Sequence, residues 1–157
     1  MAYKCNNCGH IFEKGEAATW TEDHGFIDGF CETFYGCPIC KGDYEETTPC
    51  TKCGREKTNE ELYSGFCKEC LNKRLTKEIA IKYLVENEIV IDFAFAVLFN
   101  VEAPKTTSKA ILDFILPFVE NHATKESLSA YIFDDEAGIE DFAEWLSVED
   151  RNEKEVK

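Results

Sequence analysis

The sequence lacks any apolar segment long enough to cross a membrane. Its longest apolar run, 89–99, is interrupted by Asp92 and falls short of the roughly 20 residues of a spanning helix, so we expect a buried core helix there. A basic-then-apolar signal segment is also missing, because the first cysteine pair begins at residue 5. Nine cysteines without such a signal favour thiolate chemistry in a reducing compartment. We therefore expect a cytoplasmic protein with no membrane association.

Motifs of common enzymes are absent from the sequence. It contains no phosphate-binding glycine loop, no nucleophile elbow and no carboxylate pair in a catalytic context. Positive charge is scarce as well, because 17 Lys and Arg stand against 31 Asp and Glu, for a net charge of −14. That charge opposes binding of DNA over a large surface and favours a basic protein or a nucleoprotein as partner. We expect a binding protein without catalytic residues, not an enzyme.

The chain does contain four Cys-x-x-Cys pairs. Such pairs close tight turns, and two facing turns supply the four tetrahedral thiolates that zinc prefers. The spacing predicts a first site from Cys5, Cys8, Cys37 and Cys40, and a second from Cys50, Cys53, Cys67 and Cys70. Because a four-thiolate site has no open coordination position, we expect two structural Zn²⁺ ions.

Iron is the less favoured alternative at the first site. The motif C-x-x-C-G-x-x-F at 5–12, followed by C-P-x-C at 37–40, is similar to the knuckles of rubredoxin. In that family, iron held by four thiolates transfers single electrons. The second cluster is not a rubredoxin feature, so rubredoxin-like electron transfer stays an alternative for the first site alone.

The fold class that these patterns predict is a small metal-bound α+β protein. Residues 1–48 are expected to form a zinc ribbon, and 49–85 a treble-clef-like module or second ribbon running into a helix over 71–84. Only residues 41–49 separate the two sites, so the sites should touch or share a strand. An all-α bundle is expected at 86–148 and a charged tail at 149–157.

Apolar spacing in the bundle predicts helices at 86–100, 106–119, 125–133 and 138–147. Pro117 is expected to end or kink the second of these, and Thr124 and Asp135 to cap the third and fourth. Five phenylalanines are expected in the core. They are Phe93, Phe95, Phe99, Phe114 and Phe118.

Cys31 is the cysteine outside the pairs. It is a candidate nucleophile beside His24 or His10, or a spare ligand, but a small buried thiol on a strand is the favoured interpretation. His10 is expected to pack beside the first pair and not to bind the metal.

Two charged stretches are candidate partner surfaces. The basic stretch 51–77 is a candidate nucleic-acid contact and makes a nucleic-acid-binding transcriptional regulator the alternative function. Its residues are Lys52, Arg55, Lys57, Lys73 and Arg74. The acidic C-terminal helices form a candidate surface for a basic partner and resemble DNA phosphates in charge. Its residues are Asp134, Asp135, Glu136, Glu140, Asp141 and Glu144.

Motifs at the cysteine pairs, between them and near the C-terminus carry a family resemblance. They are C-x-x-C-G-x-x-F at 5–12, E-D-H-G at 22–25, G-C-P-I-C-K-G-D-Y-E-E at 36–46, C-x-x-C-G at 50–54, G-F-C-K-E-C at 65–70 and F-A-E-W-L at 142–146. Together they resemble uncharacterised double zinc-ribbon proteins of phages and prophages of Gram-positive bacteria. The resemblance implies a virus-related, zinc-binding protein of the host cytoplasm and no particular activity. The expected function is a phage-type adaptor or inhibitor that binds a host protein or nucleoprotein, with anti-defence inhibition through the acidic surface as one form.

Overall fold

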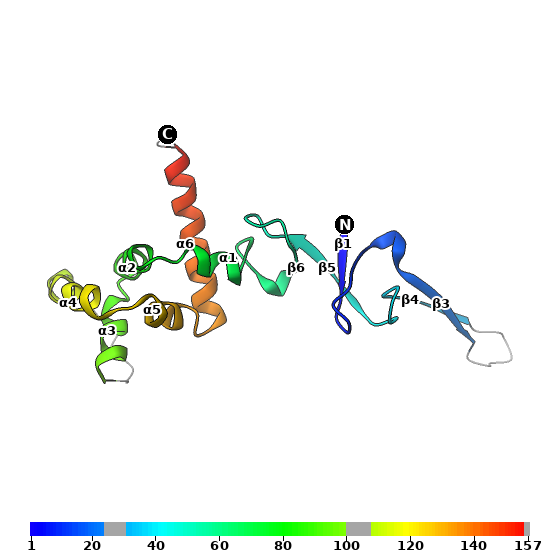
Figure 1. Cartoon of the computed structure of the whole chain (residues 1–157), viewed down its shortest axis with the longest axis horizontal. Helices are drawn as coiled ribbons and strands as arrows, with labels where there is room; N and C mark the ends of the chain where they lie inside the picture. The colour runs from blue at the N-terminus through cyan, green and yellow to red at the C-terminus, as the bar shows by residue number, and fades with distance from the viewer. Residues whose placement is uncertain (24–30, 100–107, 156–157) are drawn as a thin grey trace. The chain divides into compact units, whose positions relative to one another are not determined.

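The computed structural model describes residues 1–23, 31–99 and 108–155, the last three of these as backbone only. The chain divides into two units, Met1–Cys67 and Lys68–Lys157. The first is built mainly of strands and the second of helices (Figure 1). The predicted class, a small α+β protein, is confirmed.

A four-stranded antiparallel sheet of order β2-β1-β5-β6 forms the centre of the first unit. Its strands are β1 (Ala2–Cys5), β2 (Ile11–Glu13), β5 (Tyr44–Pro49) and β6 (Glu56–Thr58). Strand β5 pairs with β1 where Tyr44 lies opposite Cys5, and with β6 where Pro49 lies opposite Glu56. Since β5 leaves the Cys37–Cys40 loop and enters the Cys50–Cys53 loop, the two cysteine sites share this strand, as their short spacing predicts.

Two smaller hairpins complete the first unit. Strands β3 (Ala18–Asp23) and β4 (Cys31–Gly36) follow the short 3-10 helix η1 (Lys14–Glu16) and form a two-stranded ribbon. A second 3-10 helix, η2 (Asn59–Glu61), precedes strands β7 (Leu62–Tyr63) and β8 (Phe66–Cys67). Ser64 and Gly65, with φ of 46° and 85°, supply the left-handed turn that such a tight hairpin needs. A small core of Tyr3, Phe12 and Tyr44 packs against Cys5 and Cys37.

The second unit contains six α-helices in its described part. They are α1 (Lys68–Arg74), α2 (Lys77–Glu86), α3 (Val90–Phe99), α4 (Lys109–His122), α5 (Lys125–Ile132) and α6 (Glu136–Glu155). Fully buried side chains such as Leu84, Leu128 and Phe142 form their core. No helix that the structure describes has both the length and the apolarity to cross a membrane.

Several helix limits differ from those that the sequence predicts. The helix expected over 71–84 is interrupted, because α1 ends at Arg74 and the Thr76 hydroxyl, accepting the amide of Ile79 at 3.3 Å, caps α2. The helix expected from Glu86 begins only at Val90, because Glu88 adopts φ 59°. Pro117 does not end α4, which continues to His122.

The C-terminal helix is longer than expected. It begins at Glu136 and runs to Glu155, through the segment predicted as a charged tail. The predicted helix ends at Asn100 and Thr106 lie outside the described residues. The predicted caps are confirmed: Thr124 accepts the amide of Ser127 at 3.1 Å, and Asp135 Oδ1 accepts the amide of Gly138 at 2.6 Å.

The predicted phenylalanine core is only partly correct. Phe93 is buried, and Phe95 and Phe118 are half-buried. Phe99 and Phe114 are 61% and 85% exposed. Val119 is the fully buried residue of α4, and Phe114 lies about 140° around the helix from it, so burial of one directs the other towards solvent.

Candidate metal centres and charged surfaces

Three of the four Cys-x-x-Cys loops share one backbone geometry. In each, the amide of the first cysteine donates to the carbonyl five residues later at 2.9 Å. The donor–acceptor pairs are Cys5 with His10, Cys37 with Gly42 and Cys50 with Arg55. The residue after the second cysteine then donates back to the first cysteine's carbonyl with φ in the left-handed region. These residues are Gly9 (71°), Lys41 (59°) and Gly54 (68°).

The fourth pair is built differently. Cys67 ends strand β8, and Cys70 lies in the first turn of α1. The Cys67 amide donates to Cys50 Sγ at 3.3 Å, which links the hairpin to the facing loop. In this cluster one cysteine loop therefore faces a hairpin and the start of a helix.

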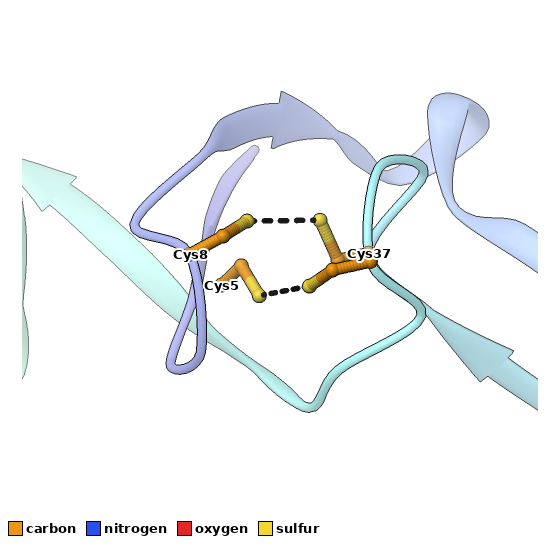
Figure 2. A group of neighbouring side chains, drawn as sticks. Cys5, Cys8 and Cys37 are labelled. Carbon is orange, nitrogen blue, oxygen red and sulfur yellow. Dashed lines mark hydrogen bonds between the residues drawn. The ribbon is translucent and has the colours of Figure 1, made fainter.

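The sulfur atoms of the first cluster point towards one another from two facing loops (Figure 2). Cys5 Sγ lies 3.4 Å from Cys40 Sγ, and Cys8 Sγ lies 3.6 Å from Cys37 Sγ. Zinc–sulfur bonds of about 2.3 Å in a tetrahedron separate the sulfurs by about 3.8 Å. A disulfide would require about 2.05 Å, and all these cysteines are free thiols. The first cluster therefore fits one four-coordinate metal ion.

The second cluster has the same dimensions. Cys53 Sγ lies 3.9 Å from Cys67 Sγ, and the four sulfurs of each cluster lie within 4.8 Å of one another. Cys50, Cys67 and Cys70 are buried and Cys53 is exposed. The prediction of two four-cysteine clusters able to hold metal is confirmed, with the same eight residues.

Backbone amides favour the thiolate form at the first cysteine of each cluster. The amides of Cys8 and Asn7, the latter 3.4 Å from the sulfur, lower the pKa of Cys5 to about 6 although burial opposes the shift. Burial raises the pKa of Cys50, but amides of Cys53 and Cys67 outweigh it and lower the value to about 6. Each cluster thus offers a thiolate near neutral pH, which is the form that binds metal.

Glycines next to the cysteine loops support the first cluster. Their role was not predicted from the sequence. A Cβ on Gly42 would lie 2.9 Å from Asn7 Cβ, 3.3 Å from Cys40 Sγ and 3.4 Å from Cys5 Sγ. A Cβ on Gly36 would lie 2.5 Å from the Lys41 carbonyl oxygen. The glycines that bracket C-P-I-C-K in the sequence were the available signal, because a metal loop leaves little room beside its sulfurs.

Cys31 belongs to neither cluster. It begins β4 opposite Asp23 and is exposed, so the expected burial is wrong. Among the described strands, β3 and β4 pair only with each other, and a two-stranded ribbon covers neither of its own faces. His10 stacks on Phe12 with ring centroids 6.0 Å apart, in agreement with a packing role, and His24 falls in the gap between residues 23 and 31 that the structure does not describe.

The five candidate basic residues are divided between the two units. Lys57 lies 3.9 Å from a Glu61 carboxylate oxygen. Arg74 donates two guanidinium bonds, of 3.1 and 2.5 Å, to the carboxylate of Asp150. Lys52, Arg55 and Lys73 are exposed. Two of the five charges are therefore already compensated by a carboxylate within the same unit.

The six candidate acidic residues have the opposite character. All are exposed, on the α5–α6 connection and along α6. They are Asp134, Asp135, Glu136, Glu140, Asp141 and Glu144. Within the described residues none of them forms an ion pair with Lys or Arg. Their charge is therefore directed to solvent.

No family model, curated protein or solved structure significantly matches this chain. Functional conclusions therefore rest on the two cysteine clusters and on the charged surfaces.

Proposed function

We propose that the protein is a non-enzymatic adaptor or inhibitor, stabilised by zinc, whose acidic helical unit binds a basic protein or a nucleoprotein. The observation that carries this proposal is the set of six exposed carboxylates, from Asp134 to Glu144, that form no ion pair with any Lys or Arg that the structure describes. Lys57 and Arg74, by contrast, are compensated internally. An uncompensated acidic surface accelerates encounter with a basic partner and repels nucleic acid.

Each cysteine cluster holds one structural Zn²⁺ in this proposal. Four thiolates fill the coordination sphere, so the ions stabilise the fold and offer no position to a substrate. A segment as short as 1–48 buries little apolar surface, and a structural zinc supplies apparent binding free energies of ~10–16 kcal/mol in such modules. We assign the first module to the zinc-ribbon type. The second is assigned to the treble-clef type, because its cysteine loop faces a hairpin followed by the helix that carries Cys70.

The motif resemblance to phage and prophage double zinc-ribbon proteins supports a cellular setting for this activity. The chain would act in the cytoplasm of a bacterial host. Its target would be a host protein that itself handles nucleic acid, for which the acidic helices substitute as a mimic of phosphate charge. Inhibition of a host defence nuclease is one form of this function.

The test uses the zinc-loaded full chain, immobilised and exposed to nuclease-treated bacterial lysate across a salt series. DNA is then added to the bound protein. If the acidic surface mimics DNA, the chain and the DNA should compete for the same site on the captured protein. Amidation of all six surface carboxylates to Asn or Gln should abolish capture and competition, whereas a Lys52→Gln, Arg55→Gln, Lys73→Gln variant should retain both. Capture that survives in the amidated variant contradicts the proposal. Nucleic acid that copurifies without nuclease and is lost in the basic variant would support the transcriptional-regulator alternative instead.

A further inference from the structure

The second unit contains an open cavity of about 1090 Å³ that is lined by residues of α2, α3, α5 and the beginning of α6. Tyr83, Phe93 and Tyr131 contribute aromatic rings to its wall. Its carboxylates come from four different segments. They are Glu88, Asp92, Asp134, Asp135 and Asp141. Among the described residues that line the cavity, none is Lys or Arg. The cavity is therefore both aromatic and strongly negative.

Asp92 is the described residue of the cavity wall that has an unsatisfied buried oxygen. It lies in the first turn of α3, a helix that is otherwise apolar. Its Oδ1 atom is buried and accepts no hydrogen bond from the residues that the structure describes. The positive end of the helix dipole favours an acid in the first turn, but it does not satisfy this buried acceptor. Asp92 Oδ1 thus offers an acceptor for a donor that the described part of the chain does not supply.

Two tyrosines lie in the field of these carboxylates. Burial, and then the charge of Asp141, raise the pKa of Tyr83 to about 12. Burial and the charge of Asp92 raise the pKa of Tyr131 above its usual value. Both rings therefore carry a neutral hydroxyl at neutral pH. Aromatic faces combined with carboxylates are the surroundings that stabilise an alkylammonium or guanidinium ion.

The carboxylates do not form a metal site. Among the described His, Cys, Asp and Glu residues, the two cysteine clusters are the groups that converge closely enough to hold an ion. Four acids outside the cavity are paired, and two of them are Glu61 with Lys4 and Asp150 with Arg74. By contrast, Asp92 and Asp141 have no ion pair within the described residues. Dispersed negative charge around so large a volume suits several cationic groups on an extended chain better than a single small ion.

We propose that this cavity receives arginine and lysine side chains of a basic peptide segment, with Asp92 and Asp141 as acceptors and the rings of Tyr83 and Tyr131 as walls. The inference deepens the proposed function and rests on it, because Asp134, Asp135 and Asp141 belong both to the cavity and to the acidic surface. Charge complementarity identifies the occupant, because the described residues of the wall supply carboxylates and neither Lys nor Arg.

The experiment measures binding of a fluorescein-labelled oligo-arginine peptide to the zinc-loaded full chain by fluorescence anisotropy. The variant Asp92→Asn/Asp141→Asn removes two charges from the cavity without changing side-chain shape and should weaken binding by about tenfold or more. The matched variant Asp113→Asn/Glu120→Gln removes the same charge from exposed α4 positions outside both the cavity wall and the acidic surface, and should change binding by about twofold or less. Spermidine, which carries the same ammonium chemistry on a small molecule, should displace the peptide poorly.

Equal weakening in the two double variants would overturn the cavity assignment, because it would show that the net charge of the chain and not the position of the carboxylates sets binding. Spermidine that binds as tightly as the peptide would overturn the peptide as occupant. The proposed function has its own test: capture that survives amidation of all six surface carboxylates would contradict it. The Asp92→Asn/Asp141→Asn chain should melt no lower than wild type, since Asp92 is half-buried with one oxygen that accepts no hydrogen bond from the described residues, and Asp141 is exposed. If it does melt lower, the single variant Asp141→Asn tests the cavity assignment instead, because Asp141 is exposed. This single variant should still weaken peptide binding several-fold.

Discussion

Lys4 and Glu61 form a bidentate ion pair that connects the segments carrying the two cysteine clusters. Lys4 Nζ lies 2.8 Å from both carboxylate oxygens of Glu61, although the residues are 57 positions apart. Lys4 precedes the first cluster's Cys5 in β1, and Glu61 ends η2 between the two cysteine pairs of the second cluster. Glu61 also accepts the amide of Thr58 at 3.1 Å, which caps η2. One carboxylate thus connects the two modules and completes a helix cap.

Glu61→Gln is expected to destabilise the first unit modestly. The bond from Lys4, followed by the Thr58 amide, holds the pKa of Glu61 below its usual value. A carboxyl with a lowered folded pKa contributes stability above its unfolded pKa, and that contribution is lost as pH falls through the folded value. It is therefore complete at pH 7. Because the side chains of Lys4 and Glu61 remain 30% and 35% exposed, the loss should be about 0.5–1 kcal/mol of unfolding free energy and shrink at high salt.

Urea unfolding at pH 7 with fixed zinc measures this loss, and Glu60→Gln at the exposed neighbouring position is the control. A loss of equal size in the control, or one insensitive to salt, would show that the ion pair does not connect the modules.

Cys70→Ser should remove the metal of the second cluster only. Three thiolates bind zinc much more weakly than four, so metal content should fall from about two ions per chain to about one, and the second module should lose its cooperative melt. Elemental analysis and circular dichroism measure these two effects. Cys31→Ser is the matched control, because Cys31 lies outside both clusters and is exposed. Loss of metal in that control would refute the assignment of ligands. The same elemental analysis identifies the metal, since iron in the first cluster would give a coloured protein.

Gly42→Ala should loosen the first metal site without removing a ligand. The added methyl would press on Asn7 Cβ and on the sulfurs of Cys40 and Cys5. Affinity at that site should fall by about tenfold in competition with a zinc chelator, as is typical when a residue supporting the ligands is changed. At Gly15 the space for a methyl is open, so Gly15→Ala should leave the affinity unchanged. Equal zinc affinities in the two variants would contradict the close packing around the first cluster.

Acidification from pH 8 towards pH 5 should release the metals, because protons compete with the metal for the cysteine thiolates. The pKa of Cys5 and of Cys50 is lowered to about 6, so these thiols stay ionised at neutral pH. For a thiol whose folded pKa lies below the unfolded value, the stabilisation present above the unfolded pKa declines as pH falls and is gone below the folded pKa. A zinc indicator dye followed during titration from pH 8 measures release. Substantial release above pH 7 would contradict the prediction.

Phe142→Ala and Phe114→Ala should differ sharply in cost. Phe142 is fully buried and contacts Tyr83 edge-on with centroids 5.3 Å apart, so its loss should cost about 3–5 kcal/mol. Phe114 is 85% exposed, so its loss should stay within about 0.5 kcal/mol. Urea unfolding of the two variants measures both values. A large cost at Phe114 would indicate that a partner or a second copy covers α4.

The cysteine sites could be predicted completely from the sequence. A Cys-x-x-Cys pair closes its turn within a few residues, as the repeated hydrogen bonds at Cys5, Cys37 and Cys50 show. The sharing of strand β5 by the two cysteine sites could also be predicted, because the short spacer 41–49 leaves little room for any other connection between them. These features depend on local geometry and on the chemistry of sulfur.

Other outcomes required the tertiary structure. The apolar spacing of α4 does not reveal that Val119 faces the core while Phe114 faces solvent. In the sequence, Asp92 is only an interruption of an apolar run. In the fold it lines a cavity with Tyr131 from α5 and Asp141 from α6, and one of its oxygens accepts no hydrogen bond from the described residues. Residue type and spacing thus determined the two cysteine clusters of this protein. Tertiary packing alone decided which side chains are buried and which charges stay uncompensated, because both depend on neighbours that are distant in sequence.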